Sequence, residues 1–266
     1  MEEKNILKGR IRDLASKAAN QGYVTRTRFL SLSEQNLFQK ILQEEKYLSA
    51  EGTIFGSAYF FYGGQMDSDR KCAFFLPDYY DQETYEILID QGEEIVCLHL
   101  YPKAPQFADT FTHRDVLGSL MSLGLEREEF GDILVRAPEA YVFLLKEVAP
   151  IVKEKMSRIK HTDIRSEILK PSECPWEREF IEKEINIASN RLDNILAEVF
   201  HLSRGDAQSL IRGEHVFVEG ETVVANAHEL KEGARVSIEG FGKFLFLGIK
   251  KETRKGRFQA LIKQYR

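Results

Sequence analysis

The stretch RLDNILAEVFHLSRGDAQSLIRGEHVFVEG, residues 191–220, decides the fold of the C-terminal part of the chain. Its first third carries apolar side chains at the i, i+3, i+4, i+7 and i+8 positions of one helix face: Leu192, Ile195, Leu196, Val199 and Phe200. Asn190 precedes this run, and its side chain is typical of a residue that caps a helix. Asp193 would then be a capping residue at the third helical position. The pattern predicts one short amphipathic helix.

A second helix and a hairpin follow in the same stretch. Ser203 stands three residues before Asp206, which is the spacing of a helix N-cap and its partner. Gly213 is expected to end this helix in the left-handed conformation. Further along the chain, the pattern predicts short strands at residues 216–218, 223–224, 235–239, 243–249 and 257–263, with a tight turn at Gly220. We therefore expect a small α+β domain over residues 186–266, with two helices on a small sheet.

The charge of the chain is distributed unevenly. The 266 residues contain 37 Lys and Arg against 42 Asp and Glu, a formal net charge of −5, which by itself argues against a nucleic-acid partner. Residues 186–266 nevertheless carry a net charge of +3, and residues 1–185 carry −8. The segment 243–266 has eight basic residues and one acid. This asymmetry favours a local nucleic-acid contact at the C-terminal end.

A polar stripe on the second helix is the strongest candidate for such a contact. Arg204, Gln208 and Arg212 are spaced by four residues and therefore share one helix face. The planar guanidinium fork of arginine donates two hydrogen bonds to one phosphate, and helix N-termini add backbone donors. The full set of candidate RNA-binding residues comprises Arg191, Ser203, Arg204, Gln208, Arg212, His215, Lys243, Lys250, Lys251, Arg254, Lys255 and Arg257.

The front of the chain predicts a multi-domain α+β protein. Capping-box spacings at Ser31 and Glu34, and at Thr112 and Asp115, each precede an apolar helix face. Further helices are expected at residues 5–20, 82–90 and 146–158, and strands at residues 53–62, 71–76, 94–101, 131–135 and 140–145. Prolines and charges indicate that residues 166–184 are an interdomain linker or its edge. The expected division is an N-terminal α/β region at 1–85, a middle RNA-binding-like α+β domain with its linker at 86–185, and the domain at 186–266.

Composition and cysteine spacing restrict the cofactors and the compartment. No apolar run follows the N-terminus and no stretch approaches the roughly 18 apolar residues of a spanning helix, so we expect neither a signal peptide nor a membrane partner. Cys72, Cys97 and Cys174 are far apart and form no Cys-x-x-Cys pair, so we expect buried thiols rather than a disulfide or a metal site. A cytoplasmic monomer without a cofactor is the simplest interpretation.

No set of residues builds a recognisable active site. Arg191-Leu192-Asp193 is similar to the catalytic Asp motif of pseudouridine synthases, but it lacks the flanking glycine and Thr-Ser-Gly of those enzymes. His113-Arg114-Asp115 is an isolated pair of titratable groups, and a triad needs a third partner. The glycine pairs do not extend to a nucleotide-binding Gly-x-Gly-x-x-Gly turn. We therefore expect a protein without catalytic activity.

The C-terminal stretch resembles the "S-four" RNA-binding domain, first seen in a small-subunit ribosomal protein. The resemblance is carried by Arg191-Leu192-Asp193, Leu196-Ala197, Leu202-Ser203-Arg204, Ala207, Leu210-Ile211, Gly213, Val216, Val218 and Gly220. The chain departs from that family at Asp206 and Glu219, which make the surface less basic. The resemblance implies an RNA-binding module in the C-terminal domain.

The front of the chain resembles the YlmH-like RNA-binding proteins of bacteria. The resemblance is carried by Tyr62-Gly63-Gly64, Asp69-Arg70-Lys71, Phe75-Leu76-Pro77-Asp78-Tyr79, His113-Arg114-Asp115, Leu117-Gly118, Leu120-Met121, Leu123-Gly124, Arg127-Glu128 and Gly131-Asp132-Ile133-Leu134-Val135. It implies a non-enzymatic partner of the ribosome that binds rRNA or tRNA, or both, on the large subunit during quality control of stalled translation. Lys71, Arg114 and Arg127 are possible secondary RNA contacts, although surface ion pairs explain such residues more often.

Two alternatives stay open. The chain could be an RNA-modifying enzyme, of the pseudouridine synthase or methyltransferase type, with an unrecognised catalytic domain. A weaker alternative is an interaction scaffold linked to cell division.

Overall fold

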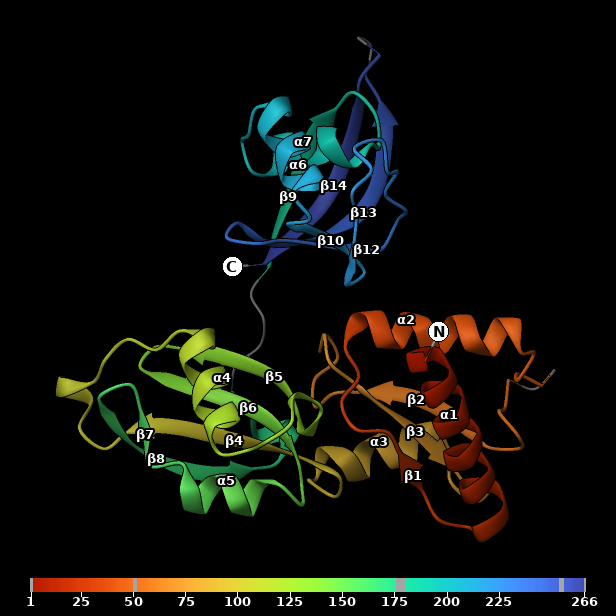
Figure 1. Cartoon of the computed structure of the whole chain (residues 1–266), viewed down its shortest axis with the longest axis vertical. Helices are drawn as coiled ribbons and strands as arrows, with labels where there is room; N and C mark the ends of the chain where they lie inside the picture. The colour runs from red at the N-terminus through yellow and green to blue at the C-terminus, as the bar shows by residue number, and fades with distance from the viewer. Residues whose placement is uncertain (1, 50–51, 176–179, 254–255, 266) are drawn as a thin grey trace. The chain divides into compact units, whose positions relative to one another are not determined.

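The computed structural model describes residues 2–49, 52–175, 180–253 and 256–265, and the chain divides into two compact units, residues 1–177 and 178–266. Each unit combines helices with antiparallel sheets (Figure 1). The expected multi-domain α+β class is therefore confirmed. How the first unit divides at residue 85 stays a proposal.

The first half of unit 1 is a small sheet covered by two helices. Its elements are α1 (Glu2–Gln21), β1 (Thr25–Arg26), α2 (Leu32–Glu44), β2 (Ala58–Tyr62), β3 (Cys72–Leu76) and α3 (Gln82–Asp90), and the strand order is β1-β3-β2. Ile11 of α1, Phe38 of α2 and Phe75 of β3 are fully buried in one apolar cluster. Ser31 and Glu34 form the expected capping box at the start of α2. Only residues 58–62 of the expected strand 53–62 pair as β2.

The second half of unit 1 contains a larger antiparallel sheet. Its elements are β4 (Ile95–Pro102), η1 (Pro105–Phe107), α4 (His113–Ser122), η2 (Arg127–Glu129), β5 (Phe130–Arg136), β6 (Glu139–Leu145), α5 (Ala149–Lys155), β7 (Arg158–Ile159), β8 (Thr162–Leu169) and η3 (Pro171–Glu173). The strand order is β5-β6-β4-β8-β7, so β4, α4, β5, β6, α5 and β8 follow the β-α-β-β-α-β pattern. The expected Thr112–Asp115 capping box is present, whereas the helix expected over 146–158 is limited to α5.

Unit 2 places two short helices on a sheet of antiparallel strands (Figure 1). Its elements are β9 (Phe180–Ile187), α6 (Leu192–Val199), α7 (Arg204–Arg212), β10 (Val216–Val218), β11 (Glu221–Thr222), β12 (Ala234–Ile238), β13 (Gly242–Glu252) and β14 (Phe258–Tyr265). The strand order is β11-β10-β12-β13-β14-β9. Ile195 of α6, Ile211 of α7 and Phe244 of β13 are fully buried in the core between the helices and the sheet. This core holds the polar face of α6 and α7 toward solvent.

The expected linker segment at 166–184 contains the division between the two units, after residue 177, but both of its ends lie in strands. Residues 166–169 complete β8, and residues 180–184 begin β9, which pairs with β14 over its whole length. The expected boundary at residue 186 therefore falls inside a strand of unit 2. β9 is an edge strand with alternating charges, FIEKEINI, and only Ile185 and Ile187 are buried. Ile181, Ile185 and Ile187 alternate with polar residues, but Lys183 interrupts this apolar alternation, and the interruption makes the half-buried strand resemble a loop.

Three details of the expected turns are also wrong. Arg191, not Asn190, is the N-cap of α6, and it makes no side-chain cap bond. Gly213 ends α7 at a φ of −80°, and the left-handed residue is Glu214 at 64°. A Cβ at Gly213 would lie 2.9 Å from the exposed His215 ring and 3.1 Å from the Ser209 carbonyl oxygen, so a larger residue would require both to shift. The return strand after Gly220 is β11, before the expected Val223–Val224.

Ser203→Ala is expected to lower the free energy of unfolding of unit 2 by about 1 kcal/mol. The Ser203 hydroxyl accepts a hydrogen bond from the Asp206 backbone N–H at 3.1 Å, and alanine would leave that donor without its cap. The matched control is Ser209→Ala. The exposed Ser209 hydroxyl donates to the Gly205 carbonyl within the helix, a bond that adds little stability. Equal losses for both variants, measured by urea unfolding, would contradict the capping role.

Candidate nucleic-acid interface

A buried carboxylate, Asp193, organises the surface where α6 meets α7. Arg191 donates from Nε to Oδ1 at 3.1 Å and from Nη2 to Oδ2 at 3.0 Å, so its fork holds both oxygens. From α7, Gln208 donates to Oδ2 at 2.9 Å and the Nε of Arg204 donates to the same oxygen at 3.3 Å. Asp193 is therefore the common acceptor of three side chains that the sequence places on two helices.

The role expected for Asp193, a capping residue at the third helical position, is wrong. Because α6 begins at Leu192, Asp193 is its second residue, and its side chain turns toward α7. It is fully buried. Burial opposes ionisation of the carboxyl, but the hydrogen bonds from Arg191, Gln208 and Arg204 outweigh it and lower the pKa of Asp193. Asp193 is thus an ionised anchor beneath the arginine side chains.

Within the polar stripe of α7, Arg204 and Gln208 are hydrogen-bonded to Asp193, whereas Arg212 is exposed to solvent. Arg204 and Gln208 reach Asp193, yet the Arg204 side chain is 58% exposed and uses only its Nε in that contact. Arg212 is exposed, and its side chain makes no hydrogen bond or ion pair with the residues that the structure describes. Ser203 is exposed, but its hydroxyl serves the cap of α7. The stripe therefore presents the outer guanidinium groups of Arg204 and Arg212 to solvent.

The remaining basic candidates of unit 2 fall into two groups. Lys250, Lys251 and Arg257 lie near the hairpin between β13 and β14, where Lys250 donates to Glu184 at 2.9 Å. His215 and Lys243 belong to the opposite end of β13, and His215 Nδ1 lies 2.8 Å from Glu239 Oε2. At about 3.3 Å per residue, Lys243 and Lys250 are separated by roughly 23 Å along the strand. Arg254 and Lys255 lie outside the described residues.

The three secondary candidates in unit 1 have different surroundings. Arg127 donates from Nη1 to the carbonyls of Phe130, at 2.6 Å, and Gly131, at 3.2 Å, and its guanidinium lies 4.6 Å from the centre of the Phe130 ring. Burial, followed by the charge of Arg70, lowers the pKa of Arg127 to about 10. Lys71 donates to the Met66 carbonyl. Arg114 is exposed on α4. Arg127 therefore supports the fold directly, and its availability to RNA stays a hypothesis.

The thiols and acids of the described residues do not assemble into a metal-binding group of three or more ligands. Cys72 and Cys97 are buried, whereas Cys174 is only partly buried, which differs from the expectation for this third thiol. Burial raises the pKa of the Cys72 thiol to about 12. Over the same described residues, each helix is too short or too polar to cross a bilayer.

The structure reveals one organising residue whose role the sequence pattern did not predict. The sequence pattern predicts a helix cap at Asp193, but Asp193 precedes Leu196 by three residues and therefore lies beside the apolar face. An acid at the edge of an apolar face, with an arginine two residues before it, is the signal that indicates an internal ion pair. The arginines of the partner helix could then be assigned as its donors.

Comparisons with known proteins give two kinds of match. Residues 96–173 match the family model described as an "RNA-binding domain in YlmH". A curated relative, the "Ribosome-associated protein quality control protein P2" of Bacillus subtilis (strain 168), is 26% identical over 208 residues, which are 77% of this chain and 77% of that protein.

Two further matches are more limited. The "Ribosomal small subunit pseudouridine synthase A" of Pseudomonas aeruginosa is 45% identical over 49 residues, which are 18% of this chain and 21% of that enzyme. Among solved structures, the "Cell division protein ylmH" from Streptococcus pneumoniae aligns with a TM-score of 0.44 at 17% identity, covering 63% of this chain and 87% of that one.

Proposed function

From the premise that this is a YlmH-like RNA-binding protein, as the family model and the curated relative support, we propose that it binds structured RNA without catalysing a reaction on it. Unit 2 makes the contact through α6 and α7. The observation that carries the proposal is the convergence of Arg191, Arg204 and Gln208 on buried Asp193, with Arg212 open beside them.

This arrangement suits the backbone of an RNA helix. Asp193 fixes the Nε of Arg204 and orients its guanidinium plane, so less side-chain entropy is lost when a phosphate binds. The outer N–H groups of Arg204 and Arg212 can each donate to phosphate oxygens. An A-form helix offers phosphates and 2′-hydroxyls rather than readable major-groove edges, so recognition through shape and backbone is expected.

The proposed partner is the ribosome, and the proposed compartment is the cytoplasm. The curated relative is named for ribosome-associated protein quality control, which supports the same process for this chain. Within it, we propose that a monomer contacts rRNA or tRNA, or both, on the large subunit when translation has stalled.

The main alternative, an RNA-modifying enzyme, is represented by the pseudouridine synthase relative, but the match spans only 21% of that enzyme. Arg191-Leu192-Asp193 is the stretch most similar to a catalytic motif of such enzymes. Asp193 has no exposed area and already accepts hydrogen bonds from three side chains. A carboxylate in this state has no path to a nucleotide, so the motif argues for binding rather than catalysis. The cell-division scaffold stays the weaker hypothesis.

Co-sedimentation of the purified full chain with separated ribosomal subunits tests the proposal. We expect the protein to pellet with the large subunit at about 50 mM monovalent salt and to dissociate strongly by about 200 mM, because phosphate contacts release counterions. Pelleting with the small subunit alone would refute the proposed location. No pelleting with either subunit would refute the ribosome as partner.

A second measurement addresses catalysis. Mass spectrometry of nucleosides from rRNA and tRNA, after incubation with the protein and common methyl donors, is expected to show no new modification. A reproducible product would replace the binding proposal with the enzymatic one.

A further inference from the structure

Two cysteines that are distant in the sequence, Cys97 and Cys174, meet at one end of the larger sheet of unit 1. Cys97 is the third residue of the central strand β4 and lies opposite Leu169, the last residue of β8. The chain then turns through η3, which lies against β4, and Cys174 follows directly. Cys174 packs against the apolar cluster that contains Cys97. These two residues are the thiol pair.

The two sulfur atoms of the thiol pair are in direct contact. The Cys97 and Cys174 side chains are hydrogen-bonded to each other, and this bond, followed by burial, raises the pKa of the Cys97 thiol. Cys97 therefore keeps its proton, and its S–H can stabilise a thiolate at Cys174. A disulfide needs the two sulfur atoms about 2 Å apart, so sulfur atoms already in hydrogen-bond contact have only a short distance to close.

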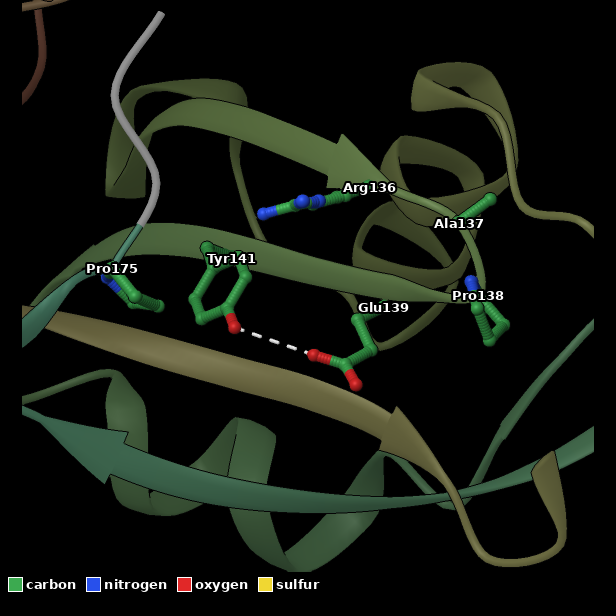
Figure 2. Close-up of a pocket in the computed structure, with 6 residues that line it drawn as sticks. All are labelled: Arg136, Ala137, Pro138, Glu139, Tyr141 and Pro175. Carbon is green, nitrogen blue, oxygen red and sulfur yellow. Dashed lines mark hydrogen bonds between the residues drawn. The ribbon is translucent and has the colours of Figure 1, made fainter.

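The members of the thiol pair differ in their access to solvent. Cys97 is fully buried, whereas Cys174 is partly exposed. The residue after Cys174, Pro175, lines a cavity of about 310 Å³. Figure 2 shows Pro175 beside Tyr141 in this cavity, with Arg136 extending toward them from the neighbouring strand. A small solute can therefore reach Cys174 first, and it meets Cys97 only through Cys174.

We propose that the thiol pair is a reversible oxidation site, at which a peroxide converts the two thiols into a disulfide between Cys97 and Cys174. The Cys174 sulfur attacks one peroxide oxygen, the O–O bond breaks, and the products are a sulfenic acid at Cys174 and one water. The Cys97 sulfur then attacks the sulfenic sulfur, and the hydroxide that leaves takes the Cys97 proton to form a second water. The two thiols lose two electrons, which the peroxide gains.

The disulfide fixes the end of unit 1 to its central strand. Unit 1 ends at residue 177, so Cys174 lies close to the point where the chain leaves this unit. In the reduced chain, exposed hydrogen bonds hold η3 and its first flanking residue: the Ser172 hydroxyl donates to the Asp90 carbonyl at 2.9 Å, and Lys170 Nζ donates to Gln91 Oε1 at 2.8 Å. A covalent bond to the buried Cys97 resists local opening more strongly than such bonds do. In a reducing compartment, a transient disulfide of this kind serves as an oxidant sensor.

Peptide mapping of the full chain tests the proposal. The reduced protein is treated with hydrogen peroxide, unfolded in an alkylating reagent and digested. We expect a linked pair of peptides that contains Cys97 and Cys174, with a mass about 2 Da below the sum of the two thiol peptides, because two hydrogens are lost. Dithiothreitol should restore both thiols. Cys72 is the control in the same digest, since it is fully buried on β3 and is expected to stay a thiol.

A variant and a second readout complete the test. Cys174→Ser removes the accessible thiol, so Cys97 is then expected to stay reduced in peroxide, as Cys72 does. Hydrogen exchange should show the amides of residues 170–174 exchanging about tenfold more slowly in the oxidised wild type, with no such change in peroxide-treated Cys174→Ser. Two unchanged thiols in the wild type, a sulfinic acid at Cys174 without a link to Cys97, or a disulfide between the Cys174 residues of two chains would overturn the proposal.

Discussion

Asp193→Asn is expected to lower the free energy of unfolding of unit 2 by about 2 kcal/mol. The change keeps the size of the side chain but removes the charge that Arg191 and Arg204 share, and it points an amide N–H₂ at other donors. Removing one partner of a fully buried ion pair often lowers the free energy of unfolding by more than this, about 3–5 kcal/mol. Here the arginine side chains are 36% and 58% exposed, so water can solvate their charges once the carboxylate is gone.

Hydrogen exchange followed by mass spectrometry measures this effect within unit 2. The amides of α6 and α7 should exchange faster in Asp193→Asn, and those of unit 1 should not change. Glu198→Gln is the matched control, because Glu198 is an exposed acid on the same helix. If both variants exchange alike, Asp193 is not the anchor that holds α6 to α7.

The same carboxylate predicts a pH dependence of stability. Its pKa is lower in the folded chain than in the unfolded chain, so Asp193 stabilises unit 2 at pH values above the unfolded pKa of about 3.9. This contribution is lost as the pH falls from there through the folded pKa. The protection of the wild-type amides of α6 and α7, taken relative to their intrinsic exchange rates at each pH, should therefore fall below about pH 4, and the fall should be smaller in Asp193→Asn.

Replacing Arg204 and Arg212 together by alanine is expected to weaken binding to the large ribosomal subunit, or to its RNA, by about 10- to 100-fold. Each guanidinium offers charge-assisted hydrogen bonds to phosphate, and these are stronger than neutral ones. The slope of log affinity against log salt should become shallower by about 1 to 2, since two phosphate contacts are lost. Titrations at several salt concentrations measure both quantities.

The control for this double variant removes two other charges. Lys17→Ala with Lys231→Ala takes one exposed lysine from α1 and one from the segment before β12. Circular dichroism must show that both double variants are folded, because Arg204 also contacts Asp193. Arg204→Lys with Arg212→Lys keeps the charge and loses the fork, so it should recover the salt slope but only part of the affinity. An unchanged affinity in the alanine variant would place the RNA contact elsewhere.

Features that neighbouring residues determine match the sequence-based expectations, and features that distant segments determine do not. The capping boxes at Ser31 and Thr112 and the cap at Ser203 are present as expected, because each is closed by a residue three positions away. The amphipathic faces of α6 and α7 also pack inward as their apolar spacing indicates. By contrast, the sequence places residues 180–184 of β9 in the expected linker, because the three consecutive charges at 182–184 of this edge strand resemble a loop.

In the candidate site, too, the sequence predicts the locally determined features but not the contacts between distant residues. The α7 stripe and the basic C-terminal segment were predicted from spacing and charge. The sequence could not show that Arg204 and Gln208 would be tied to Asp193, since that contact joins residues 11 and 15 positions apart on two helices. Nor could it show that Lys243 and Lys250 belong to opposite ends of one strand rather than to one patch.

By itself, the sequence determined the mixed class, most helices and strands, the helix caps and the concentration of positive charge in the last 81 residues. These properties depend on hydrophobic period, turn chemistry and composition, which act over a few residues. Only the tertiary structure decided which carboxylate receives the arginines, that β9 completes the sheet of unit 2, and that the rings of Tyr101 and Tyr141 both pack against His99. Such contacts join segments whose approach depends on chain closure and core packing, which no local pattern encodes.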